Sequence, residues 1–212
     1  MRQLLFCTLC FRGSTISNLV TMFILNIERE IRYITDHKAK TFWIVLLLMV
    51  GTALSMRPSS SCLITSVTPL AIVDLELAFD HQKALRIKEV WRMNDCNNPL
   101  SLSSNGLEAA VVNIGLDFPF LLAYTSFLIV LIVLTRSKDL SKDSITTVLI
   151  YAALLAGILD VVENILMVVF LKLHPIPSYT FAISASMKFG IIGILILSII
   201  IRLFRLLIRR KI

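Results

Sequence analysis

The chain has 212 residues, of which 57% are hydrophobic and 17% charged, and its formal net charge is +7. Soluble domains are nearer to half apolar and a quarter charged, and here the apolar residues gather in long runs. The basic residues stand at the ends of those runs, as expected for flanks that face anionic lipid. Composition therefore indicates an integral membrane protein whose partner is the lipid bilayer, and it argues against nucleic acid as a partner.

Four apolar segments are candidates for helices that cross the bilayer, which takes about 20 residues per helix. The first is short, but Lys40 and Arg57 at its ends can extend toward the two interfaces. Arg57 is followed by Pro58, and this pair is expected to end the first helix. The predicted spans are residues 41–56, 107–135, 145–172 and 179–204.

The distribution of Lys and Arg predicts how these spans are oriented. The segment before the first span, the short 136–144 loop and the end of the chain are basic. Because basic flanks stay in the cytoplasm, we expect both termini inside and the long connection outside. The predicted fold class is all-α, an integral membrane four-helix bundle. Its predicted parts are a cytoplasmic or interfacial segment (1–40), a four-span membrane domain (41–204, with outer loop 57–106) and a basic cytoplasmic tail (205–212).

The outer loop contains an amphipathic element. Asp80 is a suitable N-cap for a helix that runs to about Trp91, whereas residues 74–79 alternate and fit a short extended piece equally well. We expect this element to lie on the outer membrane surface or to cap the bundle, with a solvated helix as the alternative. Cys62 and Cys96 both lie in the outer loop, so an oxidising compartment would allow a disulfide between them; two free thiols are the alternative.

Residues 1–40 are apolar but contain Arg12, whose burial in a fifth span would cost about 2.5–3.5 kcal/mol. We therefore favour a cytoplasmic interfacial helix over a span or a signal peptide. Cys7 and Cys10 form a C-x-x-C pair without a second pair, to which we assign no redox or metal role. The histidines have no zinc-like spacing, and no metal site is predicted.

Four ionisable residues lie well inside the predicted spans, where charge is expensive and therefore marks candidate functional sites. At about 1.5 Å per residue, Asp117, Asp160, Glu163 and Lys188 all fall about 13–18 Å below the outer boundary. They come from three spans and share one depth, so we expect them to meet inside the bundle. Three carboxylates against one ammonium leave a surplus that must protonate, bind a cation or be reached by water.

Helical spacing adds polar neighbours on the same faces, among them Asn113 and Tyr124 around Asp117. The candidate ligand- or ion-binding residues are Asp117, Asp160, Glu163, Lys188, Asn113, Asn164 and Tyr124. No catalytic residue and no cofactor is assigned.

Two of these segments, LDFPFLLAY at 116–124 and AGILDVVEN at 156–164, carry a resemblance. Together with the acidic-apolar helix that ends at Trp91, they resemble an uncharacterised family of small bacterial inner-membrane proteins with four spans. The resemblance covers roughly residues 72–200. It implies a four-span bundle in a bacterial inner membrane, with Asp117, Tyr124, Asp160, Glu163 and Asn164 as motif residues, and it implies no activity.

Three functional hypotheses follow from the charged residues. The favoured one is that the cluster binds or moves a proton, a cation or a small polar ligand. Alternatively, the charges only fix helix register in a structural or assembly subunit, whose partner would be another membrane protein or a second copy. The third hypothesis is an enzyme that acts on a lipid or isoprenoid with a carboxylate as acid or base. The sequence leans away from an enzyme.

Overall fold

The computed structural model describes residues 34, 37–96, 103–136, 144–173 and 176–209. The chain divides into two compact units, Met1–Thr41 and Phe42–Ile212, and apart from the first residues of α2 the features described below lie in the second. The expectations for Cys7, Cys10 and Arg12 lie outside the described residues. Within the described ranges the regular structure is all helical, without a strand beyond one isolated bridge between Asp95 and Asn105.

Among the residues that the structure describes, four helical segments are long and apolar enough to cross a membrane, as in a multi-pass membrane protein. They are α2 (Lys38–Ser55) with α3 (Arg57–Ser61), α6 (Gly106–Leu134), α7 (Ser144–Val168) with the π-helical η1 (Val169–Leu173), and α8 (Tyr179–Arg209).

These segments match the four apolar runs predicted from the sequence. The first differs most, because α2 ends at Ser55 as expected but α3 begins at Arg57. The first candidate span is therefore 24 residues long and is not limited to 41–56. At the other end of the chain, α8 continues to Arg209, so the first part of the predicted 205–212 tail is helical.

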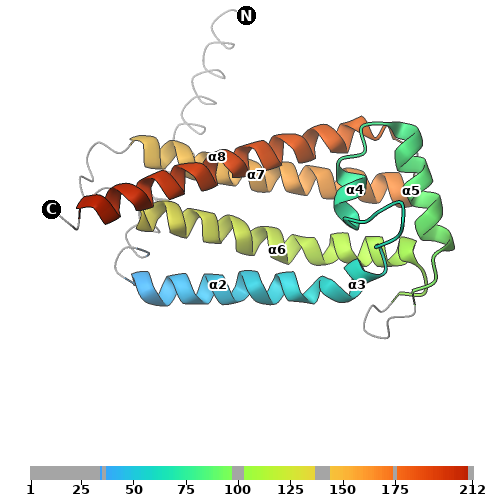
Figure 1. Cartoon of the computed structure of the whole chain (residues 1–212), viewed down its shortest axis with the longest axis horizontal. Helices are drawn as coiled ribbons and strands as arrows, with labels where there is room; N and C mark the ends of the chain where they lie inside the picture. Colours follow the sequence, from blue (N-terminus) through green and yellow to red (C-terminus); the bar gives the residue numbers. More distant parts are fainter. Residues whose placement is uncertain (1–33, 35–36, 97–102, 137–143, 174–175, 210–212) are drawn as a thin grey trace, which may run out of the picture. The chain divides into compact units, whose positions relative to one another are not determined.

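The core of the bundle is built around α7, which packs against both α6 and α8 (Figure 1). Gly157 allows α6 to approach closely, since a Cβ at this position would lie 3.0 Å from the Thr125 hydroxyl oxygen. By contrast, α2 has no buried residue, whereas α6 and α7 each bury a whole face. The bundle therefore has a tight core of three helices with α2 at its edge.

The connection between the first two spans folds over one end of the bundle (Figure 1). It contains α4 (Ile72–Glu76), which contacts α8, and α5 (His81–Met93), which contacts α6. The predicted N-cap is confirmed, because Asp80 Oδ1 accepts a hydrogen bond from the Gln82 backbone N–H at 2.9 Å. The alternating piece at 74–79 is not extended, since its first residues belong to the helical turn of α4.

Three contacts hold this cap together and in place, and the second of them reaches the bundle. The Trp91 indole is fully buried and donates to the Leu63 carbonyl at 3.0 Å. The Lys88 ammonium donates to the Phe170 carbonyl at 2.9 Å, at the end of the third span. Cys62 and Cys96 form a disulfide with a Cα–Cα distance of 5.3 Å, and the loop that it closes contains both α4 and α5. The amphipathic element thus covers the ends of α6 and α7.

Gly106, the first residue of α6, lies against the cap and gives a test of this packing. A Cβ at Gly106 would lie 2.8 Å from the Trp91 carbonyl oxygen and 3.3 Å from the Cys62 carbonyl oxygen, and backbone atoms cannot rotate away. Gly106→Ala should therefore lower the free energy of unfolding by about 1–3 kcal/mol in detergent solution. Gly115→Ala, where nothing lies within 4 Å, is the control and should not destabilise. Equal stability of the two variants would contradict the packing.

Candidate functional site

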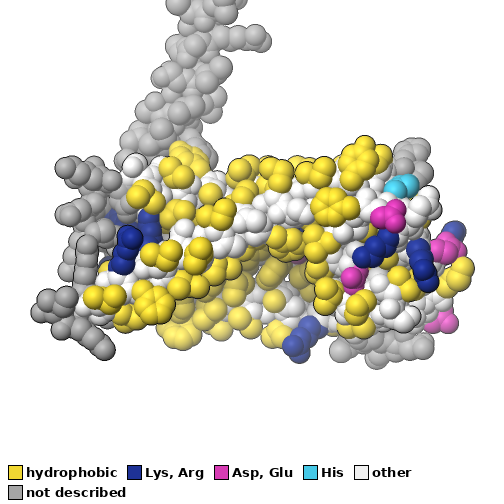
Figure 2. Space-filling model, turned by 45° about the horizontal axis from the view of Figure 1, so that its top comes forward, with side chains coloured by type: hydrophobic (Ala, Val, Ile, Leu, Met, Phe, Trp, Pro, Cys, Tyr) yellow, Lys and Arg dark blue, Asp and Glu magenta, His cyan; other side chains and the backbone are white. Residues whose placement is uncertain are grey.

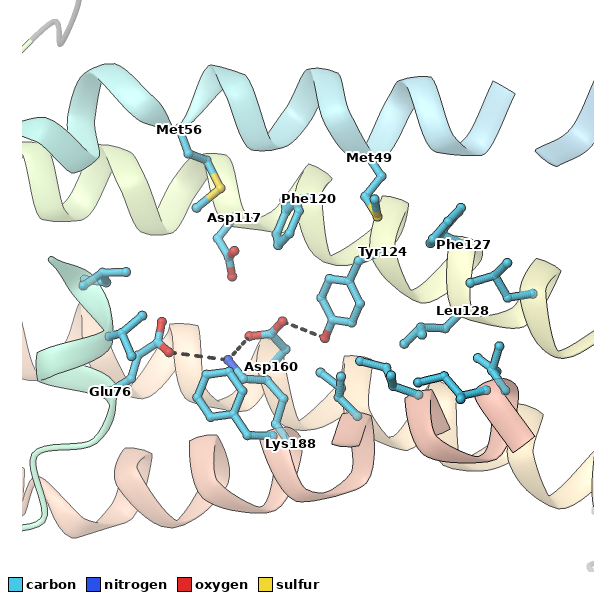
Figure 3. A pocket seen from close by; sticks show the side chains of 18 residues that line it. Met49, Met56, Glu76, Asp117, Phe120, Tyr124, Phe127, Leu128, Asp160 and Lys188 are labelled. Carbon is cyan, nitrogen blue, oxygen red and sulfur yellow. Dashed lines mark hydrogen bonds and ion pairs between the residues drawn. The ribbon is translucent and has the colours of Figure 1, made fainter. Parts of the chain in front are cut away.

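A cavity of about 620 Å³ lies among α2, α4, α6, α7 and α8 (Figure 3). This volume is typical of sites that bind small molecules. The side chains that line it are of two kinds, because the polar ones gather at one end and apolar ones cover the rest. The polar lining residues are Glu76, Asp117, Tyr124, Asp160 and Lys188.

The Lys188 ammonium is the centre of the polar end. Its Nζ lies 2.7 Å from Glu163 Oε2 and 2.8 Å from Asp160 Oδ1, both on α7. It also lies 3.8 Å from Glu76 Oε2 on α4. All four side chains are buried. The spans thus bring Lys188, Asp160 and Glu163 together at one depth, where each charge compensates for the loss of water around the others.

Local helix geometry explains this convergence on α7 and α8. Asp160, Glu163 and Asn164 stand three and four residues apart, and all three are buried on one face of α7. On α8, Ser184 lies one turn before Lys188 and donates a hydrogen bond to the Leu159 carbonyl at 2.8 Å. This bond sets α8 against α7 at the level where the ammonium meets the carboxylates.

Asp117 and Tyr124 approach the same level from α6. The Tyr124 hydroxyl donates to Asp160 Oδ2 at 2.8 Å, and the Asn164 amide donates to Asp117 Oδ2 at 2.6 Å. Asp117 points into the cavity (Figure 3), and no described residue donates a hydrogen bond to its Oδ1. Asp117 therefore presents an oxygen that is free to accept a hydrogen bond from a ligand.

Glu76 is the residue of this site that the sequence reasoning missed. It lies in the cap, outside the spans, in a segment whose alternation suggested a surface piece. A usable signal was the apolar stretch PLAIVDLELAF at 69–79, which contains two acids. Asp74 is accounted for locally, because its Oδ2 accepts a hydrogen bond from the Leu70 N–H at 2.7 Å. Glu76 turns inward, and burial raises the pKa of its carboxyl to about 7, although the Lys188 ammonium lowers it.

Asn113 shares the α6 face of Asp117, but the structure places it away from the charged cluster. Its amide donates to Ser59 Oγ at 2.9 Å, to Ser60 Oγ at 2.8 Å and to the Met56 carbonyl at 3.2 Å. Asn113 thus attaches α3 to α6. This placement differs from the expected one because a shared helix face does not determine which segment packs against it.

The fold and the site define a multi-pass helical membrane protein with a buried charge cluster beside a largely apolar cavity. Among the described residues, no group of three or more His, Cys, Asp or Glu side chains is arranged to hold a metal ion. The Lys188 ammonium occupies the point at which the carboxylates converge. Comparisons with protein-family models, with curated proteins and with solved structures give no match. The functional interpretation of the site is therefore argued from its geometry.

The stability of the cluster can be tested at Lys188. Lys188→Met leaves the surrounding carboxylates without their buried cation, and loss of one partner of a buried ion pair costs about 3–5 kcal/mol. We expect the free energy of unfolding in detergent to fall by this amount. Lys172→Met removes an exposed lysine at the end of the third span and should change it by less than about 0.5 kcal/mol. A Lys188→Met variant as stable as this control would disprove the role of Lys188.

Proposed function

We propose that this protein binds a cation, a proton or a small polar ligand within the membrane, and that a cation is the ligand its charges favour. The observation that carries the proposal is the surplus of carboxylates at the cavity. Glu76, Asp117 and Asp160 line it, and Glu163 pairs with Lys188, which is the one basic residue lining it in the described part of the chain.

The electrostatics of a low-dielectric site support a cation. Surplus buried carboxylates must be neutralised by protons or by a bound positive charge, because ionised groups without partners are too costly there. A ligand cation can take the place of a proton at Asp117, whose Oδ1 is open to the cavity. An anion would face net repulsion, since the Lys188 ammonium already interacts with three carboxylates.

A structural role for the charges accounts for part of this cluster. The ion pairs of Lys188 with Asp160 and Glu163 join α8 to α7 and would serve an assembly subunit equally well. That role leaves Asp117 unexplained, because Asp117 makes no ion pair with any residue that the structure describes and faces the cavity. We therefore assign helix packing to the Lys188 pairs and ligand binding to the carboxylates that remain, Asp117 first among them.

We further propose a bacterial inner membrane as the location, with both termini in the cytoplasm and the cap outside. Two observations support this orientation independently. The basic flanks favour the cytoplasm for the termini and the 136–144 loop. The disulfide between Cys62 and Cys96 lies in the cap, and disulfides persist in oxidising compartments outside the cytoplasm.

The binding proposal is tested by Asp117→Asn, which removes one charge and keeps an oxygen for the Asn164 amide. The full chain in lipid nanodiscs is heated with increasing ethylammonium, a small organic cation, and with ethanol as its neutral counterpart. Ethylammonium should raise the unfolding midpoint of the unaltered chain, because a ligand of the folded state stabilises it. The apparent affinity should fall at least tenfold in Asp117→Asn.

The matched control is Asp95→Asn, the same chemical change at an exposed position of the cap. It should respond to ethylammonium as the unaltered chain does. Unfolding without ligand shows whether each variant is folded. An equal response of the Asp117 and Asp95 variants, or no response of the unaltered chain, would refute cation binding at this site.

The orientation is tested with single added cysteines in cells and a maleimide that does not cross membranes. Lys83→Cys lies on the exposed side of α5 and should be labelled in intact spheroplasts. Ser141→Cys lies in the 136–144 loop and should be labelled only after the membrane is permeabilised. The opposite pattern would reverse the proposed orientation.

A further inference from the structure

The apolar part of the cavity begins directly beside the charged end. On α8, Ile192, Ile196 and Ile200 follow Lys188 at steps of four residues, and all three line the cavity. Steps of four keep side chains on one face of a helix. At 1.5 Å per residue, this apolar stripe extends about 18 Å from the level of the ammonium.

A matching stripe follows Asp117 on α6. Phe120, Phe127 and Leu131 line the cavity, and Leu131 lies about 21 Å along the helix from Asp117. Both α6 and α8 begin at the capped end of the bundle (Figure 1), so the two stripes run in the same direction away from the charges. Met49 on α2 lines the cavity from a third side (Figure 3). The cavity is therefore a long apolar arm with its charge at one end.

A small hydrophilic cation fits the charged end of this space but has no group to fill the arm. Apolar walls gain free energy when they bury apolar ligand surface, at about 0.8 kcal/mol per methylene group. The surplus of carboxylates selects against an anionic head group. The shape and the charge together match a molecule with one positive group and one long alkyl chain.

The edge of the bundle offers such a molecule a route from the lipid. The α2 helix has no buried residue, so it does not close the bundle on its side. Figure 2 shows a hollow in the middle of the molecule with hydrophobic side chains around it. An amphiphile that moves from the bilayer into this hollow exchanges lipid contacts for apolar side chains, and only its charged group needs new polar partners.

We propose that the ligand is a cationic single-chain amphiphile, with its ammonium group at Asp117 and Glu76 and its alkyl chain between the stripes of α6 and α8. This inference rests on the proposed function and adds an alkyl chain to the proposed cationic ligand. The ammonium replaces a proton at the carboxylates, so binding releases protons to the solvent. Both a membrane lipid with an amine head group and a foreign alkylammonium compound have this chemistry.

The test uses dodecylamine with a photoreactive diazirine at the end of its chain, added to the full chain in phosphatidylcholine nanodiscs. After illumination, mass spectrometry should locate the label on α6 at Phe127–Leu131 and on α8 at Ile196–Ile200. Dodecanol with the same diazirine should give less than a tenth of this labelling. Asp117→Asn should reduce labelling by dodecylamine at least tenfold, whereas Asp95→Asn should not.

A second variant separates the tail from the head group. Ile196→Trp fills the arm, so it should reduce labelling by the dodecylamine probe at least tenfold while ethylammonium still stabilises the chain. Equal labelling by amine and alcohol, with ethylammonium stabilisation intact, would overturn the amphiphile and leave the cation site standing. Loss of both effects in the unaltered chain would overturn both proposals.

An amine lipid that co-purifies would identify a membrane lipid as the source, and binding of the probe alone would indicate a foreign compound.

Discussion

The arrangement of the helices depends on the ion pairs of the Lys188 ammonium. It lies within 2.8 Å of two carboxylates on α7 and within 3.8 Å of one on the cap, so a single charge joins three separate parts of the chain. In a low-dielectric interior water cannot replace this ammonium, and removing Lys188 leaves the carboxylates around it uncompensated. Helix register, cap position and the charged end of the cavity are therefore set together.

In the proposed function, one set of residues serves both helix packing and ligand binding. Asp160 uses one oxygen for Lys188 and the other for the Tyr124 hydroxyl, so the ion pair is linked by a hydrogen bond to α6. Asp117 stands beside this linkage, and among the described residues the Asn164 amide is its hydrogen-bond donor. The proposed site keeps its geometry through the groups that are already paired, and Asp117 is the group that it offers to a ligand.

Much of this organisation could be predicted from the sequence, because it depends on distances along helices. The four apolar runs predicted the spans, and counting residues from their ends predicted that Asp160, Glu163 and Lys188 would meet. Two features could not be found in this way. Glu76 reaches the site through a fold of the cap, and Asn113 meets α3 because of where that short helix packs. The positions of Glu76 and Asn113 depend on contacts between segments, which helical spacing does not specify. The cavity beside α2 depends on such contacts as well.

The place of Glu76 in the chain has a consequence for how the protein is made. Membrane helices can insert first and associate afterwards, which brings together the charges of α6, α7 and α8 within the bilayer. Glu76 belongs instead to the loop closed by Cys62 and Cys96, which are 34 residues apart. The fourth carboxylate is therefore supplied by a segment whose closure depends on oxidation. In the proposed orientation, completion of the proposed site would follow export of the loop and respond to the redox state of the compartment that receives it.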